Sequence, residues 1–354
     1  MSLDTALQRL WYGPRWASLP LWPLSWAFRA LVALRRGLYR SGLRRAQRAP
    51  VPVVVVGNLT VGGTGKTPVV AWLARELALH GHRVGVVLRG YGGRATAQPQ
   101  LVTAASDPRE VGDEAVLHAR YGPRVVVAGA DRVAAARRAA EEGADVIVCD
   151  DGLQHPRLAR DVEIAVLHFR GIGNGWLLPA GPLRDPPERL KSVDAVVLNG
   201  NVPPLRIHGQ VFSMNAELDE VYSLADPSRR APLAALVEEQ QRKGTHIVAA
   251  AGIATPDRFF GMLRAAGLTI DEVPLPDHHD FAVSPFFGRE YDVALVTEKD
   301  AVKCRASAAM KTDGRLCAVS LRTRIEPALV DLIEAKIKPK SKSDERATDG
   351  PSPA

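Results

Sequence analysis

Cysteine is scarce in this sequence, which has only Cys149, Cys304 and Cys317 among its 354 residues. No two of them form a C-x-x-C pair, so the sequence indicates neither a disulfide framework nor a zinc site. This cysteine usage fits a reducing cytoplasm. Apart from the first fifty residues, the apolar and charged fractions are those of a soluble globular protein, and the length favours two domains.

Acidic residues are missing from a long N-terminal stretch, because none occurs between Asp4 and Glu76. The whole chain carries a formal net charge of +7 and has a pI near 9.5. Such a basic balance predicts an anionic partner, which by charge alone is a nucleic acid, a membrane surface or a phosphorylated substrate.

Residues 1–50 combine an uncharged run with a series of arginines. Residues 16–28 carry no charge but include Pro20 and Pro23, and they fall short of the ~20 residues that a spanning helix needs. They also lack an A-x-A-like cleavage site, which argues against a secretory signal.

Residues 22–43 space apolar side chains at helical intervals between arginines, a composition that suits a helix lying on a membrane. The arginines would meet anionic lipid of the cytoplasmic leaflet at ~1 kcal/mol each. The alternative is a helix that packs its aromatic face on the protein's own core. A nucleic-acid-binding arm is disfavoured because the aromatics are not interleaved with basic residues, so we expect no nucleic-acid partner.

Residues 51–67, VPVVVVGNLTVGGTGKT, pass from a β-branched apolar run through glycines into a helical pattern. A run without polar alternation is typical of a parallel strand buried on both faces. The glycines let backbone N–H groups approach phosphate oxygens at a helix start, Lys66 would reach the β- and γ-phosphates, and Thr67 would bind Mg²⁺. Thr60 replaces the first glycine of the general motif, so the match is to the GG-x-GK-T variant. The predicted phosphate loop consists of Thr60, Val61, Gly62, Gly63, Thr64, Gly65, Lys66 and Thr67.

Residues 144–152 form a second apolar run, which delivers Asp150 and Asp151 at its carboxyl end. Beside a phosphate loop this is typical of a Walker B strand, whose carboxylate faces the Mg²⁺ of the nucleotide. The alternative is an ordinary turn after a strand. Strands and helices alternate through the whole of residues 51–204, which predicts a mainly parallel sheet with right-handed crossovers.

Two loops at the ends of predicted strands are candidates for binding. Residues 89–93 (RGYGG) follow the strand predicted at 83–88, a position where ligands bind in open α/β sheets. Tyr91 there suits phosphate or sugar, and a plain turn is the alternative. Residues 171–184 form a long loop after the strand predicted at 162–168, and long loops at strand ends often carry function.

The sequence allows more than one role for each of two polar segments. Asp113 and Glu114 stand at a predicted helix start, where carboxylates act as caps, hold a metal or take a proton. His278 and His279 stand beside carboxylates in residues 274–281, which suggests a proton relay, while a surface loop is the alternative. Zinc is disfavoured because no third ligand stands at metal-like spacing.

Composition and pattern divide the chain into five parts. We predict an N-terminal membrane-associating segment at 1–50, a P-loop core at 51–204, an extended linker at 205–225, a smaller α/β domain at 226–336 and a disordered tail at 337–354. The linker is expected to form a short β ribbon between the two α/β domains.

Eight blocks of residues, taken in order, resemble the tetraacyldisaccharide 4'-kinase family of lipid A biosynthesis. They are GNLTVGGTGKTP at 57–68, RGYGGR at 89–94, EVGDE at 110–114, GADR at 129–132, DDGLQH at 150–155, LLPAGPLRDP at 177–186, PDHHDF at 276–281 and TEKDAVK at 297–303. The resemblance covers nearly the whole chain. One departure is Leu153, where the family more often has an aromatic, and it puts only local packing in doubt.

The resemblance implies a lipid kinase that uses ATP and Mg²⁺ on the cytoplasmic face of a Gram-negative inner membrane, attached as a peripheral or monotopic protein. It would transfer the γ-phosphate of ATP to the 4'-hydroxyl of tetraacyldisaccharide 1-phosphate and so form lipid IVA. We expect a monomer whose partners are this lipid and the membrane surface.

The matched motifs assign roles by position. Asp113 would take the sugar hydroxyl proton with support from His278, although residue types alone leave Asp150 and Asp151 open as the base. The other implied roles are catalytic for Lys66, Asp150 and Asp151, metal-binding for Thr67, Glu114 and Asp150, and substrate-binding for Tyr91, Arg132 and Arg184.

Because His278 lies in the smaller domain and Asp113 in the core, we expect the domains to close over ATP before transfer. The rival interpretation is a membrane-associated ATPase of the GG-x-GK-T class, which positions a partner without phosphorylating a lipid. Such ATPases often carry a lysine in a KGG loop start, where this chain has Val61.

Overall fold

The computed structural model describes residues 3–94, 98–203, 205, 207 and 209–338 of the chain. The tail predicted at 337–354 lies outside these residues from position 339 onward. The described helices, of which η1 and η2 are 3₁₀ helices, are α1 (Leu3–Tyr12), η1 (Arg15–Leu21), α2 (Trp22–Arg40), α3 (Lys66–Leu79), α4 (Pro108–Val111), α5 (Asp113–Arg120), α6 (Arg132–Glu141), η2 (Pro187–Lys191), α7 (Leu233–Lys243), α8 (Pro256–Ala265), α9 (Glu298–Cys304), α10 (Ala308–Lys311) and α11 (Ala328–Ile337).

Every strand within the described ranges belongs to one sheet, with the order β11-β10-β12-β13-β8-β7-β6-β1-β5-β2-β4-β3 and with β9 beside β8. The strands are β1 (Val53–Gly57), β2 (Val84–Leu88), β3 (Gln100–Leu101), β4 (Val125–Ala128), β5 (Val146–Asp150), β6 (Val162–His168), β7 (Ala195–Asn199), β8 (Gln210–Ser223), β9 (Arg230–Pro232), β10 (Ile247–Ala251), β11 (Asp271–Pro274), β12 (Val293–Thr297) and β13 (Leu316–Ile325).

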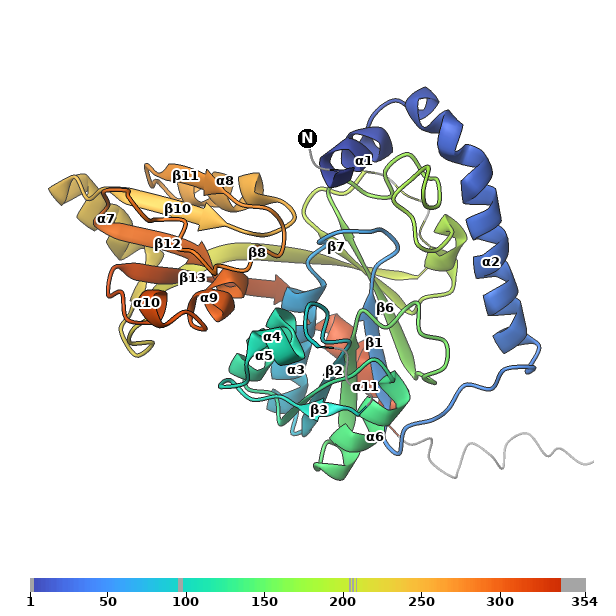
Figure 1. Cartoon of the computed structure of the whole chain (residues 1–354). Helices are drawn as coiled ribbons and strands as arrows, with labels where there is room; N and C mark the ends of the chain where they lie inside the picture. The colour runs from blue at the N-terminus through green and yellow to red at the C-terminus, as the bar shows by residue number, and fades with distance from the viewer. Residues whose placement is uncertain (1–2, 95–97, 204, 206, 208, 339–354) are drawn as a thin grey trace, which may run out of the picture.

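The sheet has two parallel regions, which confirms the mainly parallel α/β fold predicted from the alternation of strands and helices. Strands β7, β6, β1, β5, β2 and β4 pair in parallel, as do β11, β10, β12 and β13. We call β1 to β7 with their helices the core lobe, and β9 to β13 with their helices the second lobe. Figure 1 shows the two lobes side by side, with β8 running between them.

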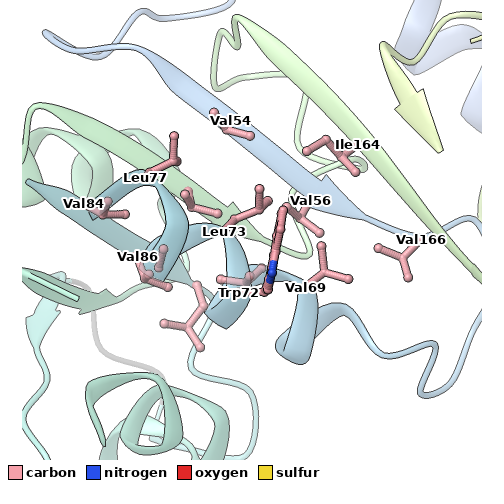
Figure 2. Packing of buried hydrophobic residues seen from close by; sticks show 14 of the residues in the cluster. Val54, Val56, Val69, Trp72, Leu73, Leu77, Val84, Val86, Ile164 and Val166 are labelled. Carbon is pink, nitrogen blue, oxygen red and sulfur yellow. The ribbon is translucent and has the colours of Figure 1, made fainter. Parts of the chain in front are cut away.

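Strand β1 is buried on both faces because its four valines alternate between two hydrophobic clusters. Val54 and Val56 pack with α3 on one face, and Val53 and Val55 pack on the other. Figure 2 shows Trp72 and other apolar side chains of α3 against β1, β2 and β6. This packing fixes the start of α3, and therefore the phosphate loop, at the carboxyl end of β1.

Strand β8 physically joins the lobes. Its residues 210–214 pair in parallel with β7, and its residues 214–223 pair antiparallel with β13. The segment predicted as an extended linker at 205–225 therefore contains a 14-residue strand within a continuous sheet. After β13 the chain returns to the core lobe, where α11 buries its apolar side chains with those of α3.

The helix predicted to start at Asp113 is α5, and Gly112 separates it from the short helix α4 that precedes it. Gly112 has φ 90°, and a Cβ at this position would lie 2.6 Å from the carbonyl oxygen of Tyr91. Only glycine accepts this backbone and this approach without strain. The break therefore brings the loop at 89–93 against the start of α5, which carries Asp113.

Trp11 of α1 is buried, whereas η1 and α2 bury small polar residues and leave most of their large apolar side chains exposed. Ser18 and Ser25 are buried, and the Ser25 hydroxyl donates to the Leu177 carbonyl at 2.8 Å. The exposed apolar side chains are Trp16, Leu19, Trp22, Leu24, Trp26, Leu31 and Leu34. The rings of Trp16, Trp22 and Trp26 thus do not pack into the core. Figure 1 shows α2 along the edge of the core lobe that faces away from the second lobe.

Helical residues Arg15–Arg40 are the one stretch of the described residues that is long and apolar enough to cross a membrane by length and composition. An 18-residue window within it has a mean hydropathy of 1.2, and 11% of that window is buried. Core helices and signal sequences can pass the same test, so this stretch is weak evidence for a membrane segment.

Candidate functional site

The predicted phosphate loop lies between β1 and α3. Gly65 has φ 88° and directly precedes Lys66, the first residue of α3. The Lys66 ammonium donates to Asn58 Oδ1 at 3.3 Å and lies 3.7 Å from Asp151 Oδ1. The first N–H groups of a helix have no partner within the helix, so the loop forms a site for phosphate oxygens.

The long loop predicted to carry function borders the phosphate loop. The Val61 N–H donates to the Pro182 carbonyl at 2.8 Å, and the Arg184 N–H donates to the Leu59 carbonyl at 2.6 Å. Gln154 donates from its amide to the Asn58 carbonyl at 3.0 Å and to the Asp185 carboxylate at 2.9 Å. The conformation of the phosphate loop thus depends on residues more than ninety positions away in the chain.

Asp151 and Arg184 form a bidentate pair beside Lys66. The two terminal nitrogens of Arg184 donate to the two oxygens of Asp151 at 2.9 and 2.8 Å, and Arg184 also donates to Asn58. Burial alone would raise the pKa of Asp151, but Lys66 and Arg184 hold it well below the usual range. Asp151 is therefore ionised at neutral pH and orients a cation at the phosphate loop.

Asp150 is buried in a different environment. Its Oδ2 lies 3.0 Å from Nε2 of the buried His118, and its Oδ1 is buried without a hydrogen-bond partner. An unpaired buried oxygen is costly, which marks this atom as a ligand position. Asp150 ends β5 next to β1, as predicted for a Walker B carboxylate.

Asp113 meets the second lobe at the start of α5. Its Oδ2 lies 3.5 Å from Nδ1 of His278 and 3.2 Å from Nζ of Lys303. Lys299 lies 3.4 Å from Glu114. Burial opposes ionisation of Asp113, but His278, Lys299 and Lys303 together hold its pKa below the usual range. The structure therefore brings together the Asp113 and His278 side chains that the sequence placed in different domains.

The three predicted substrate residues have different surroundings. Tyr91 is exposed and packs its ring against that of His278, with centroids 5.2 Å apart. Arg184 pairs with Asp151. Arg132 is buried at the start of α6 and donates to the Gly129 carbonyl at 2.6 Å.

Positive charge surrounds His155 in the motif DDGLQH. Burial and the nearby positive charges of Arg132, Arg35 and Arg89 together lower its pKa to about 4, and Asp151 opposes them. Arg35 belongs to α2, so the N-terminal segment contributes to a cationic region on the phosphate-loop side of the core lobe. Such a region attracts an anionic ligand.

A cavity of about 440 Å³ opens where the second lobe meets the end of β7. Phe169, Asn199, Thr255 and Arg258 are among the residues that line it. The Asn199 side chain donates to the Thr64 carbonyl of the phosphate loop at 3.0 Å and accepts from Arg258 of α8 at 2.8 Å. The cavity is therefore adjacent to the phosphate loop.

A family model described as tetraacyldisaccharide-1-P 4'-kinase matches residues 17–338. This chain belongs to that kinase family. A tetraacyldisaccharide 4'-kinase of Janthinobacterium sp. (strain Marseille) is 46% identical over 347 residues, which cover 96% of this chain and 98% of the relative. The corresponding protein of Herminiimonas arsenicoxydans is 45% identical over 346 residues, which cover 95% and 96%.

Among solved structures, LpxK from Aquifex aeolicus in complex with ATP superposes with a TM-score of 0.76 at 28% identity. The match covers 90% of this chain and 99% of that one. These comparisons confirm the family and the fold that the eight sequence blocks suggested.

Several residues of this kinase's site were not anticipated. Asn199 is the last residue of β7 and Arg258 lies in the first turn of α8, and neither belongs to a recognisable motif. His118 lies within α5 and has no distinguishing sequence pattern. Lys303 lies in the TEKDAVK block, where a helix follows a strand and the charged residues could serve only to cap that helix. The cap exists, because the Thr297 hydroxyl accepts from the Asp300 N–H at 3.1 Å, but Lys303 reaches Asp113 as well.

Proposed function

We propose that this protein transfers the γ-phosphate of ATP to the 4'-hydroxyl of tetraacyldisaccharide 1-phosphate and so forms lipid IVA. The observation that carries the proposal is the contact of Asp113 with His278 across the two lobes. This contact occurs in a chain that belongs to the kinase family and has a phosphate loop at residues 60–67. Phosphoryl transfer needs positioning and charge neutralisation more than covalent chemistry, and this site supplies both.

ATP would bind with its phosphates in the loop formed by residues 60–67. Support comes from the free helix N-terminus, from Lys66, and from the related LpxK structure that contains ATP. The cavity beside Asn199 has the size and mixed lining that suit the base and ribose. Asn199 would then contact both the nucleoside end of ATP and the phosphate loop.

The residues present fit a Mg²⁺ ion. Asp150 offers a buried, unpaired carboxylate oxygen, and Thr67 offers a hydroxyl in the first turn of α3. No cluster of three or more His, Cys, Asp or Glu ligands occurs in the described part of the chain, but Mg²⁺ in nucleotide sites uses one or two carboxylates plus phosphate and water. Asp150, Thr67 and Glu114 would hold the ion, which would neutralise charge on the phosphates.

Asp113 is the best placed of the three candidate bases. Asp151 is engaged by Arg184 and Lys66, and Asp150 is buried against His118. Asp113 instead faces His278, which is partly exposed and packs its ring at a tilt against the ring of the exposed Tyr91. We propose that Asp113 accepts the proton of the sugar hydroxyl and that His278 orients the carboxylate, while Lys66 and Arg184 neutralise the transferring phosphate.

The lipid would approach from the membrane side of the core lobe. The exposed tryptophans and leucines of η1 and α2 suit a bilayer surface, and Arg35 of α2 contributes to the cationic region around His155. We propose that this segment holds the protein on the cytoplasmic face of the inner membrane, that Tyr91 and Arg132 help to bind the headgroup, and that the lobes close over ATP before transfer.

The test is transfer of labelled γ-phosphate from ATP to tetraacyldisaccharide 1-phosphate in detergent micelles. Wild type should label the lipid, and Asp113→Ala should label almost none while still binding ATP. Asp226→Ala serves as the control, because Asp226 is an exposed turn residue whose carboxylate accepts from the N–H and hydroxyl of Ser228 in the same turn. If wild type hydrolyses ATP and leaves the lipid unlabelled, the substrate assignment is wrong and the ATPase interpretation takes its place.

A further inference from the structure

Helices α5 and α9 pack against each other where the lobes meet. The contact contains three polar pairs, which in order along α5 are Asp113 with Lys303, Glu114 with Lys299 and Tyr121 with Glu298. Residue numbers rise along one helix as they fall along the other, so the helices run antiparallel. Glu298 therefore binds Tyr121 at the carboxyl end of α5, which is the end farthest from Asp113.

Glu298 is held by polar groups from three parts of the structure. Its Oε2 accepts from the Tyr121 hydroxyl at 3.1 Å and from the Leu321 N–H at 3.2 Å. Its Oε1 accepts from the Tyr222 hydroxyl at 3.5 Å. A carboxylate withdrawn from water is stable only with such partners, so these bonds define the position of Glu298 closely.

Tyr121 connects Glu298 to α5, the helix that contributes Asp113 and His118 to the site. Tyr121 caps α5, and its ring meets the ring of His118 edge-on with centroids 6.4 Å apart. His118 in turn contacts Asp150. Asp113 begins the same helix, so a shift or rotation of α5 would move Asp113 and the partner of Asp150 together.

We propose that Glu298, acting through Tyr121, is a positioning residue that holds α5 in the orientation required for phosphoryl transfer. Glu298 touches neither the phosphate loop nor Asp113, so its effect on the reaction is indirect. The proposal rests on the function proposed above, because it assumes that Asp113 acts in that transfer. It assigns the TEKD segment a role beyond capping α9.

The first test compares Tyr121→Phe with Tyr291→Phe. Both changes remove one tyrosine hydroxyl that donates to a carboxylate, but Tyr291 bonds Asp313 inside the second lobe. Tyr121→Phe should lower kcat for lipid phosphorylation about tenfold, the loss expected for one hydrogen bond to a charged group, while KM for ATP changes less than about twofold. Tyr291→Phe should keep wild-type kcat. Equal kcat in the two variants, with an active wild type, would overturn the proposal.

A second measurement separates positioning from general destabilisation. In an Asp113→Asn background, adding Tyr121→Phe should lower kcat by much less than tenfold, because the group that α5 positions is already impaired. Glu298→Gln retains an acceptor for Tyr121 and should recover most of the activity that Glu298→Leu loses. Fully additive losses in the double variant would show that Tyr121 does not act through Asp113.

The positional part of the proposal can also be measured without substrate. Hydrogen exchange of the α5 amides should be faster in Tyr121→Phe than in wild type, and unchanged in Tyr291→Phe. If wild type proves unable to phosphorylate the lipid, the proposed function fails, and faster exchange in α5 would still support the structural link. Unchanged exchange in Tyr121→Phe would refute that link.

Discussion

Replacing Gly65 by alanine probes how the phosphate loop is held. Gly65 has φ +88°, and a Cβ there would lie 2.3 Å from Nδ2 of Asn199. A left-handed backbone costs a non-glycine residue about 1–2 kcal/mol. Displacing the Asn199 amide would also break its bond to the Thr64 carbonyl, worth about 1 kcal/mol. We therefore expect Gly65→Ala to lower the free energy of unfolding by about 2–3 kcal/mol.

Two glycines of the same loop separate these contributions. Gly62 has φ +103°, but a Cβ added there would have no neighbouring atom within 4 Å, so Gly62→Ala should cost only the backbone contribution of about 1–2 kcal/mol. Gly63 lacks a positive φ, and its Cβ would make an ordinary 3.4 Å contact with Ala254. Gly63→Ala should therefore change the free energy of unfolding by less than about 0.5 kcal/mol.

The assay is urea unfolding of the three variants and wild type without nucleotide, followed by calorimetric titration with ATP. Gly65→Ala should be the least stable, and it should bind ATP more weakly than Gly62→Ala because the loop backbone has moved. If Gly65→Ala and Gly63→Ala unfold at the same urea concentration, the reasoning about Asn199 and the loop is refuted.

Two further predictions concern His155 and the N-terminal helix. Because the pKa of His155 is about 4 in the folded protein, the unfolded chain takes up a proton that the folded chain does not as pH falls below about 6.5. The free energy of unfolding should therefore fall from pH 7 to pH 5. In urea titrations, His155→Gln should reduce that fall by about 1 kcal/mol. An equal fall in the variant and in wild type would contradict this. Trp26→Glu should weaken binding to vesicles with anionic lipid about tenfold. Leu79→Glu, at a leucine of α3 that is more exposed than Trp26, should not weaken it. Equal losses would argue against a membrane role for α2.

Local patterns were sufficient to predict much of the core lobe. The strand at 53–56 and the phosphate loop after it are encoded by adjacent residues, because an unbroken valine run needs two buried faces and a glycine-rich turn follows directly. The strand β12 in the second lobe is encoded in the same way, since its residues 293–296 form an unbroken apolar run. These predictions needed no knowledge of distant contacts.

Contacts between distant segments were not predictable in the same way. Lys303 contacts Asp113 across 190 positions only because β8 and β13 place the lobes together, and no spacing in the sequence expresses that. The docking of η1 through Ser18 and of α2 through Ser25 was missed because hydrophobic periodicity identifies an apolar face, whereas here the small polar residues are buried. The rule that apolar faces turn toward the core therefore fails for this segment, whose large apolar side chains stay exposed.

The continuous sheet bears on how the lobes could close. A loop hinge would let them rotate freely, but β8 pairs with β7 in the core lobe and with β13 in the second lobe, so relative motion has to twist or bend this ribbon. The ribbon has one irregularity, a register shift between Val319 and Leu321 of β13, next to the N–H that binds Glu298. Bulges increase local twist and are where strands bend most readily. Bending there would move α9 relative to α5, and it would therefore alter the contacts of Asp113 and Glu298 together. An opening of the lobes would then withdraw His278 and Lys303 from Asp113 in one step.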